Sequence, residues 1–398
     1  VTLTEGKGYL VNGGVALGAK VISDKPIQIE LLTGDRGEQY EARWFRLSPT
    51  ALWSTSYYEP VSTSNSAQGQ NGTGTVVWLY NPKSSPIAVQ YQTRTGSGGN
   101  TITTNPITVP AKGYAKQVMT DGFGAKFFTN DGSKFYAISA TDANNPSTNT
   151  GGNRSWDWGF TLVSESALTQ QILIGLGIGR DPTSSTNPNE NGNPIWVTPI
   201  GNGNTPVTIY IDYDANPATG ALTDPFGNKY DNSITLRELD RAKLYNPSGN
   251  QSGMLIYTLT QGVKLAAAWG QDPLTASSGA PGLDVGTGIP PLPAFDAGKN
   301  GTLSQDNDGD GFISPGDDLL YTIVVNNISR APVPDLKLVD FLPLNTSYIP
   351  NTTFFTNSSG VTSQVADNGS GTPFPLDEPG TILDNSSALP VGGAYTVT

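Results

Sequence analysis

The chain has 398 residues, of which 34 are acidic and 22 are basic, so its formal net charge is −12; it contains no histidine and no cysteine. Without these two residue types it cannot form a Ser-His-Asp or Cys-His nucleophilic centre, a Cys/His zinc site, a haem ligated by either residue, or a disulfide. The strong negative charge also argues against nucleic acid and anionic membrane surfaces as partners, because both repel acidic proteins.

Short strands separated by many turns are the structure that the composition favours. Glycine and proline supply 47 and 30 residues, and 14% of the residues are charged, against roughly 25% in an average soluble domain. Period-two alternation then predicts individual strands: Ile87, Val89 and Tyr91 fall on one face, with polar residues between them. By the same criterion we expect strands at residues 27–29, 75–80, 87–93, 134–140, 159–163, 170–178, 207–213, 254–259, 263–269, 319–326 and 335–341.

One helix is predicted, at residues 235–246. Thr235 and Glu238 have the spacing of a capping box, in which the threonine hydroxyl accepts from the Glu238 N–H and the glutamate reaches back. Leu239 and Lys243 follow at helical spacing, and Pro247 would end the helix. The fold class that we expect is therefore all-β, with tandem β-sandwich domains and this one short helix.

The domain boundaries follow from length and from proline content. A chain near 400 residues exceeds what one hydrophobic core normally serves. Residues 272–302 are rich in proline and glycine and lack periodicity, which favours extended chain between domains. We therefore divide the chain into a β-sandwich region at 1–165, a β domain with an acidic loop and the short helix at 166–290, and a third domain at 291–398. None of the apolar runs approaches the roughly 20 residues of a membrane-spanning helix.

The strongest functional motif is the acidic loop at residues 306–317 (DNDGDGFISPGD). It has the spacing of a calcium-binding loop, with carboxylates at positions 1, 3, 5 and 12, a glycine at position 6 and a backbone carbonyl at position 7. Three alternating aspartates repel one another strongly unless a cation lies among them. We also expect Ile313, at position 8, to anchor the loop to the core. The predicted Ca²⁺ ligands are Asp306, Asp308, Asp310, Phe312, Ser314 and Asp317.

A second acidic cluster follows the strand predicted at 207–213. Asp212 and Asp214 project from the face opposite Ile209 and Ile211. With Asn216 and Asp224 they form a candidate Ca²⁺ site, although the segment lacks the glycine at position 6 and a clear ligand at position 12. Two alternatives stay open: a pair of glycosidase carboxylates and a solvated strand end.

Aromatic residues gather at three places, and two interpretations stay open for them. These are 44–45 (WF), Trp53 with Tyr57 and Tyr58, and 156–158 (WDW). Such side chains can stack on sugar rings. They also bury the largest apolar area per residue, so packing in the core of a sandwich is the interpretation that we favour.

Two segments of the chain are similar to known families. The strand-and-turn patterns at 23–35 (SDKPIQIELLTGD), 43–50 (RWFRLSPT), 57–58 (YY), 77–82 (VWLYNP) and 134–140 (KFYAISA) resemble the N-terminal domain of IgGFc-binding-protein-like surface proteins. Residues 316–327 (GDDLLYTIVVNN) and 340–343 (DFLP) resemble a conserved immunoglobulin-like repeat of bacterial envelope proteins. The resemblance implies a series of immunoglobulin-like sandwich domains at a cell surface. It does not imply an enzymatic activity.

These observations predict a non-enzymatic extracellular protein of a bacterial cell surface, a calcium-stabilised subunit of a filament, sheath or surface layer. The alternative is a carbohydrate-binding adhesin module or stalk, with a glycan or another cell-surface ligand as partner. The first residues lack a signal-peptide pattern, so we expect a trimmed, mature chain. The repeat family continues beyond the last residues with a closing strand. We therefore expect an open edge there, which the segment at residues 1–6 of another copy could fill.

Overall fold

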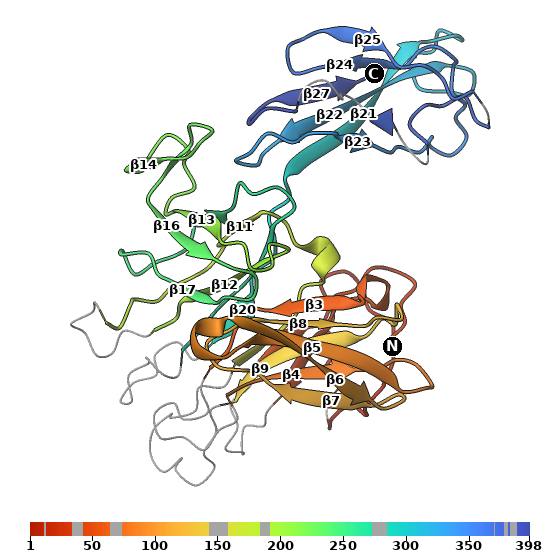
Figure 1. Cartoon of the computed structure of the whole chain (residues 1–398). Coiled ribbons are helices and arrows are strands. Elements are labelled where there is room, and N and C mark those ends of the chain that lie inside the picture. The colour runs from red at the N-terminus through yellow and green to blue at the C-terminus, as the bar shows by residue number, and fades with distance from the viewer. Residues whose placement is uncertain are drawn as a thin grey trace. The chain divides into compact units, whose positions relative to one another are not determined.

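The computed structural model describes residues 1–11, 13–33, 43–63, 74–142, 158–183, 192–272, 285–369, 371–377, 381–382 and 388–398. Within these ranges the regular structure is almost entirely β, with antiparallel strands in several sheets (Figure 1). The helical segments described are three single 3₁₀ turns: η1 (Thr50–Leu52), η3 (Ser97–Gly99) and η4 (Glu165–Ala167). None of them has the length and apolar character needed to cross a bilayer. The predicted all-β class is confirmed.

The chain folds into two compact units. The first contains residues 1–216 and 231–291, and the second contains residues 217–230 and 292–398. The predicted boundary between 290 and 291 falls next to the start of the main part of the second unit, at Leu292. The predicted boundary near 165 lies inside the first unit.

The first sandwich of the first unit is built from two four-stranded sheets (Figure 1). One has the order β3 (Ser56–Glu59), β8 (Ala125–Phe128), β5 (Ile87–Thr95), β6 (Thr101–Val109). The other has the order β10 (Trp158–Thr161), β9 (Tyr136–Asp142), β4 (Gly74–Tyr80), β7 (Tyr114–Val118). Val77 and Leu79 of one sheet and Val89 and Phe127 of the other belong to one core. A separate ribbon pairs β1 (Glu30–Thr33) with β2 (Arg43–Arg46).

The second sandwich of this unit repeats the same construction. One sheet has the order β11 (Gln171–Leu173), β18 (Leu255–Tyr257), β13 (Val207–Asp212), β16 (Asn232–Leu236). The other has the order β17 (Ala242–Leu244), β12 (Ile195–Ile200), β19 (Lys264–Gly270), β20 (Gly286–Gly288). Ile209 and Ile256 share a core with Val197 and Leu265. The alternation that predicted β13 is therefore the alternation of buried and less buried residues.

The second unit contains a five-stranded sheet and two short ribbons. The sheet has the order β21 (Phe295–Gln305), β22 (Asp318–Asn327), β27 (Ala394–Val397), β24 (Phe354–Thr356), β25 (Thr362–Gln364). The ribbons pair β23 (Lys337–Leu338) with β26 (Thr381–Ile382), and β14 (Leu222–Thr223) with β15 (Lys229–Tyr230). Its core is formed around Val325, Phe355 and Tyr395.

The strand that ends the described chain is not the open edge that the sequence led us to expect. β27 pairs with β22 on one side, where Val325 lies opposite Tyr395, and with β24 on the other, where Phe355 lies opposite Val397. It is an inner strand of its sheet. The edges of that sheet are β21 and β25.

The predicted helix at 235–246 is wrong. Residues 232–236 are strand β16, paired with β13, and β17 begins at Ala242. The turn between them contains Leu239, which is fully buried and has φ = +64°, a left-handed conformation that no α-helix accommodates. The Glu238 carboxylate, expected to cap the helix, instead accepts from the N–H of Gly203 at 2.9 Å.

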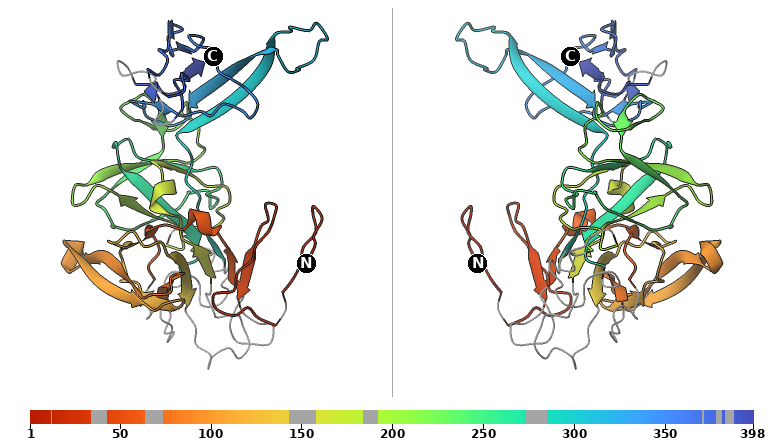
Figure 2. Two further views of the ribbon diagram at one scale, coloured as in Figure 1. Left: turned by 90° about the vertical axis from the view of Figure 1, so that its right-hand side faces the viewer. Right: turned by 90° about the vertical axis from the view of Figure 1, so that its left-hand side faces the viewer.

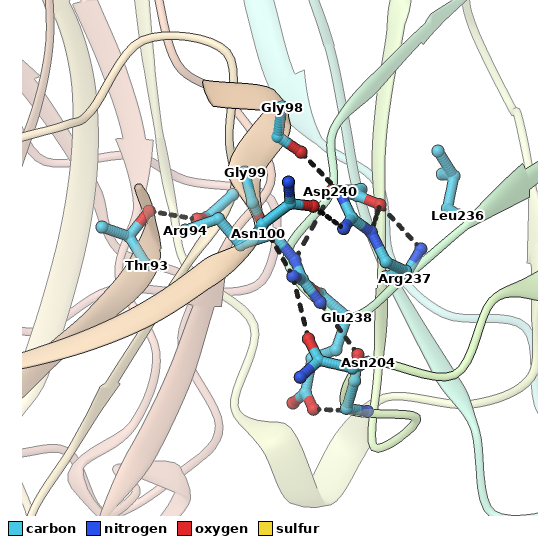
Figure 3. A network of polar contacts seen from close by, with 12 residues as sticks. Thr93, Arg94, Gly98, Gly99, Asn100, Asn204, Leu236, Arg237, Glu238 and Asp240 are labelled. Carbon is cyan, nitrogen blue, oxygen red and sulfur yellow. Dashed lines mark hydrogen bonds and ion pairs between the residues drawn. The ribbon is translucent and has the colours of Figure 1, made fainter. Parts of the chain in front are cut away.

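Tertiary contacts of the first sandwich hold this turn in place (Figure 3). Arg94 on β5 has a fully buried side chain that donates to the carbonyls of Glu238, Gly203 (2.9 Å) and Gly99 (2.9 Å) and to Asn204 Oδ1 (3.1 Å). From the opposite side, the Arg237 side chain bonds to Asp240, Asn100 and the Gly98 carbonyl. The gain from these bonds outweighs the local preference for a helix, which is worth at most a few tenths of a kcal/mol per residue.

Candidate metal centre

The acidic loop joins the two longest strands of the second unit. β21 and β22 form an antiparallel hairpin in which Gly301 lies opposite Tyr321, and residues 306–317 connect them. Figure 2 shows this connection at the projecting tip of the hairpin. Gly309 (φ = +76°) and Gly311 (φ = +78°) supply the left-handed conformations that so tight a loop requires. The chain therefore builds a calcium-type loop between strands, without flanking helices.

Three of the predicted ligands converge. Asp306, Asp308 and Asp317 each place a carboxylate oxygen within 4.8 Å of those of the other two, and no other such group of three occurs among the described residues. Ser314 joins them, because its hydroxyl donates to Asp308 Oδ2 at 3.0 Å. Asp310 is not part of the group, and its Oδ1 accepts from the N–H of Phe312 at 2.7 Å. The donor set of carboxylates and a hydroxyl fits a hard cation such as Ca²⁺.

Backbone N–H groups position the carboxylates before any ion is considered. Asp306 accepts from Gly309 (2.7 Å) and Gly311 (2.8 Å), and these bonds hold the pKa of its half-buried carboxyl below the usual value. Asp317 accepts from Asn307 (2.9 Å) and Ser314 (2.8 Å), which ties the two ends of the loop together. These bonds therefore orient the carboxylates of Asp306 and Asp317, and they favour the ionised form of Asp306.

The loop is not anchored in the way that we predicted. Ile313 is 61% exposed and Phe312 is 74% exposed. The prediction that Ile313 packs into the core is wrong, because the loop lies beyond the ends of β21 and β22 and leaves this side chain exposed. The contacts that the described residues show in this loop include hydrogen bonds of its acidic side chains.

The second acidic cluster has a different local structure. Asp212 is fully buried at the end of β13 and accepts from the N–H of Asp214, which in turn accepts from the N–H of Asn216. Asp224, in the turn between β14 and β15, accepts from the N–H groups of Phe226 (2.8 Å) and Asn228 (3.0 Å) and from the Asn228 amide. Asp212, Asp214 and Asn216 belong to the first unit and Asp224 to the second. The bonds of Asp224 stabilise its own hairpin turn.

The aromatic residues divide into buried and accessible ones. Tyr57, Tyr58 and Trp158 are almost fully buried, and the Trp158 indole N–H donates to the carbonyl of Gln271 at 3.0 Å. Trp44 is 64% exposed. Trp156 lies outside the described residues.

Trp53 combines an aromatic ring with an open surface. Its ring stacks on Tyr136, with 5.0 Å between the ring centroids. Beside it lies a hollow of about 380 Å³, with Lys134 and Ser164 among the residues that line it. This combination of a ring, a cation and hydroxyl groups is chemically suited to a polar ligand such as a sugar.

Sequence reasoning missed a buried carboxyl group. Glu59, at the end of β3, is fully buried, and its Oε1 accepts from the N–H of Val61 at 2.7 Å. Burial raises the pKa of Glu59 to about 8, against the opposing effects of the Ser139 hydroxyl and the Val61 N–H. The signal in the sequence was an acid enclosed by apolar residues, in YYEPV.

A comparison with known proteins adds no further information about this site: no family model matches the sequence, and no curated protein and no solved structure is significantly similar to it.

Proposed function

We propose that this protein is an extracellular structural protein of a bacterial cell surface, a calcium-stabilised subunit of a filament, sheath or surface layer. The observation that carries the proposal is the convergence of Asp306, Asp308 and Asp317 at the tip of the β21–β22 hairpin. The likeness of residues 1–165 to the N-terminal domain of IgGFc-binding-protein-like surface proteins supports the location, and so does the likeness of residues 316–327 and 340–343 to an immunoglobulin-like repeat of bacterial envelope proteins.

Calcium has a mechanical role in this proposal. The chain contains no cysteine, so no disulfide can stiffen it. The three carboxylates have oxygens within 4.8 Å of one another, so they repel when no ion is bound. A cation bound between them attracts all three and thereby links the two ends of the loop. Binding of an ion to the folded state alone raises stability with the ion concentration, by about 2.7 kcal/mol at 100 times the dissociation constant.

The first test measures thermal unfolding in CaCl₂ and in EDTA. The native protein is expected to melt at a higher temperature in calcium. The double variant Asp306→Asn and Asp308→Asn keeps the shape of the loop but removes two charges, and its melting temperature should be the same in both solutions. The matched control is Asp335→Asn, an exposed aspartate of the same unit outside the loop, which should keep the full response. Identical melting of the native protein with calcium and with EDTA would remove the basis of the proposal.

A second candidate function is carbohydrate binding, and the hollow beside Trp53 is the observation that favours it. A glycan array probed with the native protein and with Trp53→Ala tests it. Loss of a bound glycan on this substitution, but not on Trp44→Ala, would support an adhesin. Absence of any bound glycan would leave the structural function as the better account.

A further inference from the structure

Residues 1–29 carry the side-chain pattern of a strand without forming one. Tyr9, Val11, Val15, Leu17 and Val21 all occupy odd-numbered positions, so a strand would place them on one face, while Leu10 and Ile22 would fall on the other. Each is between 57% and 63% exposed. Residues 1–11 and 13–29 contain no strand (Figure 2). Five large apolar side chains that each leave more than half of their surface exposed indicate a surface that is covered by another molecule.

The local conformation of this segment is weakly held. Among the described residues, the N–H of Lys7 donates to the carbonyl of Thr4 at 3.1 Å and that of Ala19 to the carbonyl of Ala16 at 3.0 Å, each closing one turn. Gly18, with φ = +79°, lies in the second turn and can also adopt extended conformations. Straightening residues 4–19 into a strand opens these two turns.

The second unit offers a long open edge that fits such a strand. Among the described strands, β21 lies at the edge of its sheet and pairs with β22 alone. Its residues 296–302 are all exposed, and it contains no proline. Gly298 and Asn300, together with Thr322 and Val324 of β22, line a shallow hollow of about 430 Å³ on the outer face. Beyond the irregular pairing at residues 303–305, the edge is long and exposed, and edges of this kind accept a further strand from another chain.

Two other edges in the described residues are less suited. β25, at the opposite edge of the same sheet, has three residues. β6, at the edge of a sheet in the first unit, contains Pro106, which has no N–H to donate. Among these three edges, β21 alone combines length with a complete row of backbone N–H groups.

Charge favours the same pairing. Residues 292–398 contain twelve acidic and three basic side chains, so most of the net charge of −12 lies there. Residues 1–29 contain three lysines, Glu5 and Asp24, which gives them a net charge of +1. Opposite charges steer the segment toward the second unit, and screening by salt weakens that attraction.

We propose that the N-terminal segment of one copy adds as a strand to the β21 edge of a second copy. The inference rests on the proposed function and specifies how the subunits associate. The contact is heterologous, since the donating and accepting surfaces differ, and it therefore propagates into a filament unless its rotation closes a ring.

The cysteine-free chain permits a direct test by disulfide cross-linking. One copy carries Val15→Cys and a second carries Asn300→Cys; they are mixed in calcium, oxidised and separated on a non-reducing gel. The yield of mixed dimer should be at least tenfold higher than in a control where the second copy carries Thr104→Cys, at an exposed position on β6. Leu17→Cys should cross-link and Ala16→Cys should not, because neighbouring residues of a strand face opposite sides. Equal yields at residues 16 and 17, or at positions 104 and 300, would overturn the proposal.

Deletion of residues 1–27 separates this inference from the proposed function. The shortened protein should remain folded and sediment as a monomer at concentrations where the full chain associates. Assemblies of unchanged size after the deletion would exclude strand donation by this segment while leaving a structural function intact. Absence of both cross-linking and association in the full chain would contradict both.

Discussion

Replacing Glu59 by glutamine should make the stability of the first unit much less dependent on pH. Glu59 is fully buried, and its pKa of about 8 compares with an ordinary value of 4.5. Below pH 4.5 the group is protonated in both the folded and the unfolded protein. Between pH 4.5 and 8 the unfolded state releases this proton and the folded state keeps it, so stability falls as the pH rises.

The size of this effect follows from the two pKa values. Each pH unit in the window lowers the free energy of unfolding by about 1.4 kcal/mol, so the total at pH 8 is about 5 kcal/mol. Glu59→Gln retains an oxygen that can accept from the Val61 N–H and has no proton to release. The variant should therefore match the native protein near pH 4.5 and exceed it by several kcal/mol near pH 8.

Urea denaturation at a series of pH values, followed by tryptophan fluorescence, measures the difference between the two proteins. Contributions from the other carboxyl groups are common to both and cancel in this difference. A difference that stays constant from pH 4.5 to 8 would show that Glu59 is ionised in the folded protein, and it would refute the reasoning from burial.

Three further outcomes are expected. Arg94→Lys should destabilise the first unit by about 3 kcal/mol in urea denaturation, because lysine cannot reach the same set of buried acceptors. The control Arg46→Lys, at an exposed arginine, should change stability by less than about 0.5 kcal/mol. Equal effects of the two substitutions would contradict the role of the buried network. Gly286→Ala should lower stability by about 1–3 kcal/mol, since a methyl group there would lie 1.9 Å from the Trp158 ring, while Gly298→Ala, which meets nothing within 4 Å, should be neutral. No glycan or peptide should be turned over by the purified protein; turnover that is lost on substitution of a single carboxylate would contradict a purely structural function.

The fold class and many strands could be predicted because period-two alternation reflects burial directly. The predicted strands at 75–80 and 263–269 correspond closely to β4 and β19. The predictions failed where contacts with residues distant in sequence determine the burial or the local conformation of a segment. Arg94 falls on the polar face of its strand by alternation, yet it is buried because the turn at 237–240 covers that face. The same contacts overrode the capping box at Thr235, and no local pattern could reveal them.

The candidate site was predictable in part for a related reason. The spacing of the acidic loop identified Asp306, Asp308 and Asp317, which converge, but it also predicted Asp310, which does not join them. The spacing does not specify what lies beneath the loop, so the expected burial of Ile313 failed. Glu59 was missed because its altered pKa arises from burial by residues distant in sequence.

Sedimentation velocity of the full chain in calcium and in EDTA, with electron microscopy of the same samples, tests the central claim most directly. A calcium-stabilised structural subunit should form linear or layered assemblies in calcium, and these should shorten or dissociate when EDTA removes the ion. A protein that remains a single monomeric species in calcium at every concentration, with no assemblies on the grid, would contradict the account.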